Sequence, residues 1–162
     1  MKISVIIPVY NEQENLAKRL SFLCKQANKI PLEIIVSNSP ETFDETPKVC
    51  EIFSNIRFIS SPKKGRATQM NFGTKHATGE IFLFLHADVS LPNDFYSQIV
   101  NVVKAGFKVG FFAYKFDRET PLLNLNSSFT KNDGIFAGGG DQCQFFTKEI
   151  FEKLNGYNEE YC

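Results

Sequence analysis

Short, almost uninterrupted apolar runs alternate along the chain with segments in which apolar residues recur every three or four positions. Residues 3–9 are β-branched and nearly free of polar side chains, which is typical of a strand buried on both faces of a parallel sheet. Residues 14–28 then carry apolar side chains at helical spacing. The opening of the chain therefore predicts a strand, a loop and a helix.

The same alternation continues along the chain. The predicted strands are residues 3–9, 32–36, 56–60, 81–85, 109–116 and 144–146. The predicted helices are residues 14–28, 47–53, 67–77, 93–105 and 148–154, and residues 117–140 show no regular pattern. This order predicts an α/β fold, a mostly parallel sheet with helices on both faces. Ligands of such sheets bind at the carboxyl ends of the strands, so the loops after residues 9, 36 and 85 should face one crevice.

Size and charge narrow the class of protein. With 162 residues, 43% of them apolar, the chain predicts one domain over residues 1–162. Basic and acidic residues both number 18, so we expect no nucleic-acid partner. No apolar stretch approaches the roughly 20 residues of a transmembrane segment. Four dispersed cysteines and no secretory leader favour a cytoplasmic protein, with the inner face of the membrane and a homo-oligomer left open.

A polar group follows the first predicted strand. Pro8, Tyr10, Asn11 and Glu12 offer a ring and an amide that could hold a base, and a carboxylate that could accept hydrogen bonds from a sugar. The same residues also suit a helix start in which Asn11 caps the helix and Glu14 completes a capping box. The sequence leaves both interpretations open.

The fourth predicted strand runs into His86, Ala87 and Asp88. A carboxylate at this position can bind Mg²⁺ or Mn²⁺ together with diphosphate oxygens, because hard cations prefer oxygen ligands. The alternative is that Asp88 caps the helix expected after Pro92.

Two glycine-containing loops are further candidates. Lys63, Lys64 and Arg66 surround a glycine before a predicted helix, whose free N–H groups favour anions, and the guanidinium of Arg66 can hold two phosphate oxygens. Residues 138–140 are glycines that lead into Asp141 and Gln142, a composition that lets a ligand approach the backbone. A solvated basic turn and a flexible turn are the respective alternatives.

These motifs together resemble family 2 glycosyltransferases, and more narrowly a bacterial branch with His-Ala-Asp in place of Asp-x-Asp. They read SVIIPVYNE from residue 4, GRATQMNFG from residue 65, ATGE from residue 77, FLHAD from residue 84, GDQ from residue 140 and LNGY from residue 154. The resemblance implies a GT-A fold, a Rossmann-like domain for nucleotide-diphospho-sugars. It also implies a nucleoside-diphosphate sugar as donor, with Mg²⁺ or Mn²⁺ between Asp88 and the diphosphate.

The resemblance also implies roles for individual residues. Arg66 would approach the base or phosphates, and His86 would hydrogen-bond the ribose or another part of the ligand. Asp141 and Gln142 would face the acceptor or the donor sugar, and they are the catalytic candidates. The donor-binding candidates are Pro8, Tyr10, Asn11, Glu12, Ser37, Arg66, Asn71, His86 and Ala87.

Two departures from the family pattern change the expectations. Ser37 stands where relatives carry an aspartate that reads uracil, so strict uridine specificity is not expected. Relatives also have a Glu-Asp pair beyond the Gly-Tyr segment, and its aspartate serves as the catalytic base. Because this chain stops at Cys162, we expect a C-terminally incomplete domain whose base lies beyond that residue.

The expected activity is transfer of a sugar from the nucleotide donor to the hydroxyl of an unknown acceptor, with inversion. One alternative is a nucleotide-sugar-binding module or inactive fragment without transfer. Another is a sugar nucleotidyltransferase, although the chain has no early glycine-rich, basic signature loop after its first strand.

Overall fold

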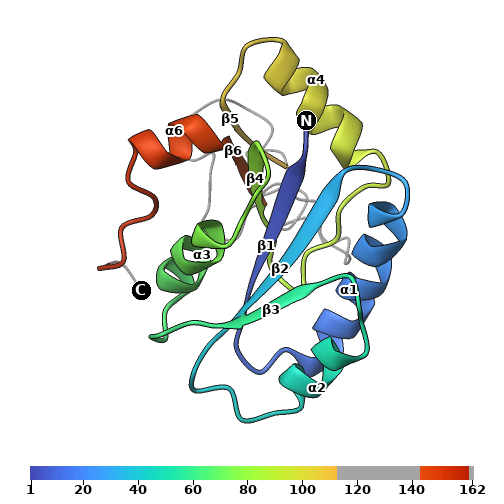
Figure 1. The fold of residues 1–162 in the computed structure, drawn as a ribbon, viewed down its shortest axis with the longest axis vertical. Coiled ribbons are helices and arrows are strands. Elements are labelled where there is room, and N and C mark those ends of the chain that lie inside the picture. Colours follow the sequence, from blue (N-terminus) through green and yellow to red (C-terminus); the bar gives the residue numbers. More distant parts are fainter. Residues whose placement is uncertain (113–142, 161–162) are drawn as a thin grey trace, which may run out of the picture.

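The computed structural model describes residues 1–112 and 143–160. Its six-stranded sheet has the order β3-β2-β1-β4-β6-β5 (Figure 1). The strands are β1 (Ile3–Val9), β2 (Leu32–Asn38), β3 (Arg57–Ser60), β4 (Ile81–Phe84), β5 (Val109–Phe111) and β6 (Gln144–Thr147). The helices are α1 (Gln13–Ala27), α2 (Thr46–Glu51), α3 (Arg66–Lys75), α4 (Phe95–Lys104) and α6 (Lys148–Lys153). The α/β class predicted from the sequence is confirmed.

The sheet is mostly parallel, as expected. β1 pairs in parallel with β2 from Ile3↔Leu32 to Val9↔Asn38, and also with β4. β2 pairs in parallel with β3. In the described part of the sheet only β6 runs in the opposite direction, antiparallel to both β4 and β5. The carboxyl ends of β1, β2, β3 and β4 therefore lie along one edge.

Helices cover both faces of the sheet. Figure 1 shows α1, α2 and α4 on one face, and α3 and α6 on the other. The two apolar clusters follow the alternation of side chains along β1, since Val5 and Ile7 pack with α1 and α4, whereas Ile6 packs with Met70 of α3. This double burial explains why β1 is apolar at almost every position.

Element ends differ slightly from the expected ranges. α1 begins at Gln13 and α2 at Thr46, each one residue earlier than predicted. The strand expected over residues 109–116 covers Val109–Phe111 in the structure, and residues 113–116 lie outside the described part. Within residues 1–112 and 143–160, no helix has the length and apolar character needed to cross a bilayer.

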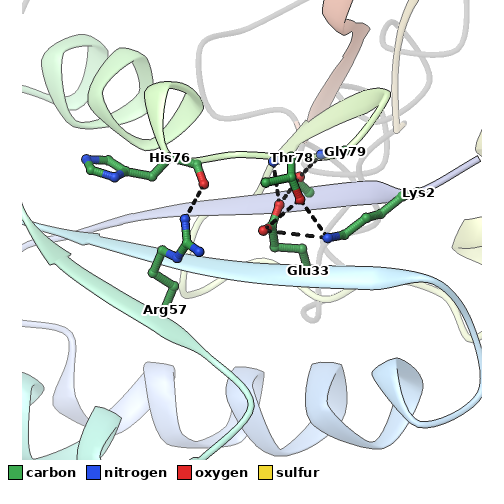
Figure 2. Close-up of polar contacts among 7 residues, drawn as sticks. Lys2, Glu33, Arg57, His76, Thr78 and Gly79 are labelled. Atoms are coloured by element: carbon green, nitrogen blue, oxygen red, sulfur yellow. Dashed lines mark hydrogen bonds and ion pairs between the residues drawn. The ribbon is translucent and has the colours of Figure 1, made fainter.

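A polar network closes the edge of the sheet opposite the carboxyl ends (Figure 2). Glu33 of β2 accepts hydrogen bonds from the Ser4 hydroxyl and from the Thr78 backbone and side chain, and its Oε1 lies 3.7 Å from the ammonium of Lys2. The Gly79 N–H donates to the Ser4 hydroxyl at 2.9 Å. The network ties β1, β2 and the start of β4 together.

Glu33 should make folding stability depend on pH. Burial acts to raise the pKa of Glu33, but hydrogen bonds from Ser4 and Thr78 and the charge of Lys2 lower it overall. A lowered folded-state pKa means that this contribution is complete above the ordinary pKa of 4.5 and is lost as the pH falls through the folded-state value. We expect Glu33→Gln to lower the free energy of unfolding by about 1–3 kcal/mol at pH 7.

Urea unfolding of the wild type and of Glu33→Gln between pH 3 and pH 7 measures this effect. The difference between them should shrink at the acid end of the range, while the exposed control Glu51→Gln should differ little from wild type at any pH. A difference for Glu33→Gln that is the same at every pH would contradict the assignment.

Candidate active site

A pocket of about 760 Å³ opens at the carboxyl ends of β1 and β4, beside the start of α3. It brings together the polar group after β1 and the His-Ala-Asp segment, which were predicted to face one crevice, and it adds the basic glycine loop. The loop after residue 36, which was expected at the same crevice, contributes no residue to the lining. Its lining residues are Pro8, Val9, Tyr10, Glu12, Lys64, Gly65, Arg66, Gln69, His86, Ala87 and Asp88. Six of the nine predicted donor-binding residues and the predicted metal residue line this pocket.

The loop after β1 is held by the loop after β2, and not by a capping box. Asn11 has φ 54°, a left-handed conformation that asparagine tolerates, and its side-chain oxygen accepts a hydrogen bond from the Phe43 N–H at 3.0 Å. The free N–H groups at the start of α1 donate to other side chains: Glu12 N–H to Thr46 at 2.9 Å, and Gln13 N–H to Asp44 at 3.1 Å. The capping-box interpretation is therefore wrong, because Asp44 and Thr46 satisfy these groups.

Tyr10 forms part of a contact between three loops. Its ring is 40% exposed and meets the Phe43 ring edge-on, with 6.4 Å between centroids. The Lys64 ammonium lies 4.8 Å from the centre of the Tyr10 ring and 2.8 Å from a carboxylate oxygen of Glu41. The hydrogen bond that the Lys64 ammonium donates to Glu41 raises the pKa of Lys64, and the negative charge of Glu41 and then Tyr10 act in the same direction. Lys64 thus keeps its charge beside an aromatic face in the pocket.

The start of α3 suits an anion. Gly65 has φ 130°, a conformation that favours glycine, and Arg66 begins the helix directly after it. The first turn of α3 has no acidic residue, so its N–H groups and dipole are not opposed by negative charge from that turn. Both Gly65 and Arg66 line the pocket.

Gln69, one turn further along α3, joins the helix to the ends of β1 and β2. Its amide nitrogen donates to the Val9 and Ser37 carbonyls, at 2.8 Å each. The Val9 carbonyl also accepts a hydrogen bond from the Ser39 N–H at 2.9 Å, so Gln69 adds a buried contact at the end of the β1–β2 pairing. Gln69 belongs to one of the motifs of the sequence, but no role for it could be predicted, because only the tertiary fold brings it to the two strand ends.

A buried arginine of α1 forms hydrogen bonds to the chain around Asp88. Arg19 of α1 is only 9% exposed, and it donates to the Ala87 carbonyl at 3.4 Å and to the Ser90 hydroxyl at 3.2 Å. Burial lowers the pKa of Arg19, and the negative charge of Asp88 acts in the opposite direction. Arg19 therefore contacts the chain on both sides of Asp88, through the backbone of Ala87 and the side chain of Ser90.

The alternative interpretation of Asp88 as a helix cap is wrong. α4 starts at Phe95, and Asp94 occupies its capping position. Asp88 lies six residues before Asp94 and therefore cannot cap this helix. Asp88 is exposed and lines the pocket together with Glu12. No group of three or more metal-binding side chains occurs in residues 1–112 or 143–160. A carboxylate in a pocket that is also lined by an arginine at a helix N-terminus fits a cation that takes its other ligands from a diphosphate and water.

Three predicted donor-binding residues do not line the pocket. The Asn11 side chain is bound to Phe43, as described above. Ser37 is fully buried, and its hydroxyl has no hydrogen-bond partner among the described residues. Asn71 exchanges hydrogen bonds with the Tyr157 backbone and donates to Glu159 at 2.9 Å. Asp141 and Gln142 lie outside the described residues.

The segment after α6 returns to α3. Gly156 has φ 76°, and Tyr157 packs against Phe84, Phe146 and Phe151. The carboxylate of Glu159 accepts hydrogen bonds from Thr68 and Asn71 of α3, the latter bond being the main cause of its lowered pKa. This segment is therefore anchored to the helix that starts at the pocket.

Comparison with known proteins identifies the family. The sequence model described as Glycosyl transferase family 2 matches residues 4–159. The chain belongs to this family. Dolichol-phosphate mannosyltransferase of Pyrococcus furiosus is 29% identical over 109 residues, covering 65% of this chain and 31% of that protein. Glycosyltransferase GlyA of Streptococcus pneumoniae is 32% identical over 130 residues, covering 75% of this chain and 18% of that protein.

Solved structures of glycosyltransferases confirm the GT-A fold of this family 2 chain. The mannosyltransferase PcManGT of Pyrobaculum calidifontis, in complex with GDP-Man and Mn²⁺, superposes with a TM-score of 0.74 at 22% identity, over 98% of this chain and 48% of that chain. Glucosyl-3-phosphoglycerate synthase of Mycobacterium tuberculosis, with Mn²⁺, UDP and phosphoglyceric acid, gives 0.70 at 19% identity, over 93% and 57%. This chain thus spans about half the length of these neighbours and about a third of the mannosyltransferase of Pyrococcus furiosus.

Proposed function

We propose that this chain is the donor-binding part of a metal-dependent glycosyltransferase, which transfers a sugar from a nucleoside-diphosphate sugar to an acceptor hydroxyl with inversion. The observation that carries the proposal is one pocket with an exposed aromatic ring, an arginine at a helix N-terminus and a carboxylate at a strand end. Tyr10 offers a stacking face for a base, Arg66 suits phosphates, and Asp88 suits a divalent cation. Two structural neighbours are complexes with Mn²⁺ and a nucleotide or nucleotide sugar, which agrees with this set of groups.

The proposed roles follow from the charges that change during the reaction. The sugar leaves a diphosphate, which gains negative charge as the glycosidic bond breaks. Arg66 and the α3 N-terminus stabilise that charge without having to reorient. A divalent cation held by Asp88 would add positive charge at the diphosphate. Glu12 and His86 offer hydrogen-bonding groups to the nucleoside, so we place the base that activates the acceptor outside the described pocket lining.

Ligand-dependent stabilisation tests the donor and the metal together. We expect UDP or GDP to raise the melting temperature clearly with Mn²⁺ and little in excess chelator, because a ligand that binds only the folded state adds about 2.7 kcal/mol at 100 times its dissociation constant. Thermal unfolding with each nucleotide, with Mn²⁺ or with chelator, is the measurement. Equal stabilisation in chelator would remove the metal from the proposal.

Arg66 should matter more than its basic neighbour. We expect Arg66→Ala to weaken diphosphate binding by about 1.5–3 kcal/mol, the usual contribution of a hydrogen bond to a charged group. Arg66→Lys should recover only part of the loss, since an ammonium cannot form the two parallel hydrogen bonds of a guanidinium.

Calorimetric titration of UDP or GDP in the presence of Mn²⁺ gives these affinities. Lys63→Ala is the matched control, because Lys63 belongs to the same loop but does not line the pocket. Small and equal effects of Arg66→Ala and Lys63→Ala would show that the loop is a solvated basic turn.

A further inference from the structure

Gln69 presents a hydrogen-bond acceptor of fixed direction to the pocket. Only 4% of this residue is exposed, and it belongs to the pocket lining. Both N–H bonds of its amide are used, one toward the Val9 carbonyl and one toward the Ser37 carbonyl. Carbonyl oxygens only accept hydrogen bonds, so the amide nitrogen must face them and the amide cannot flip. The side-chain oxygen of Gln69 therefore points away from the two strand ends.

This oxygen remains available to a ligand. No residue of the described part of the chain donates a hydrogen bond to it, and it is not among the fully enclosed side-chain atoms that lack a partner. Gln69 and Pro8 both line the pocket. Pro8 pairs with Ser37 across the β1–β2 ladder. The neighbouring Ser37 hydroxyl is fully buried and does not line the pocket.

A fixed acceptor distinguishes the nucleobases by their ring nitrogens. Uracil carries a hydrogen at N3 and guanine carries one at N1, so each can donate to the Gln69 oxygen. Cytosine N3 and adenine N1 carry lone pairs at the corresponding positions and would face that oxygen with no hydrogen between them. A site built to hydrogen-bond one group rejects an analogue that lacks it, because its own polar group is left unpaired.

We infer that Gln69 is a specificity-determining residue that selects nucleoside diphosphates with a ring N–H, uracil or guanine, over those of cytosine and adenine. The inference rests on the proposed function, since it requires a nucleoside diphosphate in this pocket. It assigns base selection to a side chain of α3 and not to the end of β2, where Ser37 is enclosed.

The first test compares four nucleotides on the full-length protein. Calorimetric titration with UDP, GDP, CDP and ADP, all with Mn²⁺, should give UDP or GDP at least about 10-fold tighter binding than CDP and ADP. CDP or ADP binding as tightly as the better of UDP and GDP would overturn the inference. Failure of all four to bind would overturn the proposed function instead, so the two failures are distinguishable.

A methylated nucleotide tests the hydrogen bond without changing the protein. N3-methyl-UDP keeps the ribose and the diphosphate but lacks the ring N–H, and we expect it to bind at least about 10-fold more weakly than UDP. If GDP is the tighter ligand, N1-methyl-GDP replaces it in the same comparison. Equal affinity of the methylated and unmethylated nucleotides would overturn the inference.

Substitution of Gln69 then assigns the selection to this residue. Gln69→Leu should bring the affinities for the four nucleotides to within about threefold of one another, and N-methylation should no longer weaken binding. Met70→Leu, in the same turn of α3 but packed toward the sheet, should keep the wild-type preference. A preserved preference in folded Gln69→Leu would overturn the assignment, and if that variant does not fold, the methylated nucleotide decides.

Discussion

Asp88→Asn is expected to abolish the metal-dependent part of nucleotide binding and to lower sugar transfer by the full-length enzyme at least about 100-fold. The neutral amide keeps the shape of the side chain but is a much poorer ligand for a hard cation. Loss of a group that stabilises the leaving diphosphate typically costs about 10²–10³ in rate. Transfer rates at saturating donor, together with thermal shifts in Mn²⁺ and in chelator, measure the two effects.

The same substitution should leave the fold intact. Asp88 is exposed and removes no packed surface when it becomes asparagine, so the melting temperature without ligand should stay close to that of wild type. Asp94→Asn is the matched control, because Asp94 precedes α4 and does not line the pocket. Persistence of full Mn²⁺-dependent stabilisation in Asp88→Asn would assign the metal to another residue.

Gly79→Ala is expected to cost about 2–4 kcal/mol of folding stability, the range of a forced clash in a packed interior. A methyl group at Gly79 would lie 2.6 Å from the Ser4 hydroxyl oxygen, 2.8 Å from the Ser4 nitrogen and 2.9 Å from the Lys2 carbonyl oxygen. The last two atoms belong to the backbone of β1 and of the residue before it, so they cannot rotate away. The start of β4 would have to move from β1.

Chemical denaturation of Gly79→Ala measures this cost. Combining it with Ser4→Gly removes the clash with the hydroxyl but leaves both backbone clashes, and it also removes the hydrogen bonds of Ser4 with Glu33 and Gly79, so the double variant should not regain the lost stability. A change below about 0.5 kcal/mol for Gly79→Ala would show that the two strands separate easily at this point.

Much of the fold could be predicted because its strands and helices differ in periodicity. β1 is apolar at nearly every position since both its faces are covered, and α1 buries Leu16, Leu20 and Leu23 at helical spacing. The rule that ligands bind at the carboxyl ends of parallel strands placed the loops after residues 9 and 85 in one predicted crevice, and Tyr10 and Asp88 of these loops line the pocket. Arg66, predicted from its own loop as a phosphate-binding residue, lines the same pocket.

The rest of the site depends on contacts that have no local signal. The sequence leaves Lys64 either in an anion-binding loop or in a solvated basic turn. Nothing near it in the sequence indicates its contacts with Glu41, 23 residues away, or with the ring of Tyr10. The left-handed backbone at Asn11 and its bond to Phe43 depend on where the loop after β2 lies. A capping box was a reasonable local prediction, and a tertiary contact replaced it.

Asn71 shows why a family motif does not by itself place a residue in the pocket. It belongs to the segment GRATQMNFG that supports the resemblance, and was therefore placed among the donor-binding candidates. In the structure, the Asn71 side chain donates hydrogen bonds to the Tyr157 carbonyl and to the Glu159 carboxylate. A residue can recur in a motif because it joins two parts of the fold.

The contact between α3 and residues 157–159 has a thermodynamic consequence for the domain. α3 carries Arg66 at its first position, and its Thr68 and Asn71 bind Glu159 only one turn later. A ten-residue helix moves as one rigid body, and Gly73 lets α3 pack so close to Ile6 that a methyl group there would lie 2.5 Å from that side chain. The position of α3 therefore affects both the part of the pocket lined by Arg66 and the chain around residue 159. By reciprocity, whatever factor the ordering of that segment adds to donor affinity, a bound donor adds to the ordering of the segment.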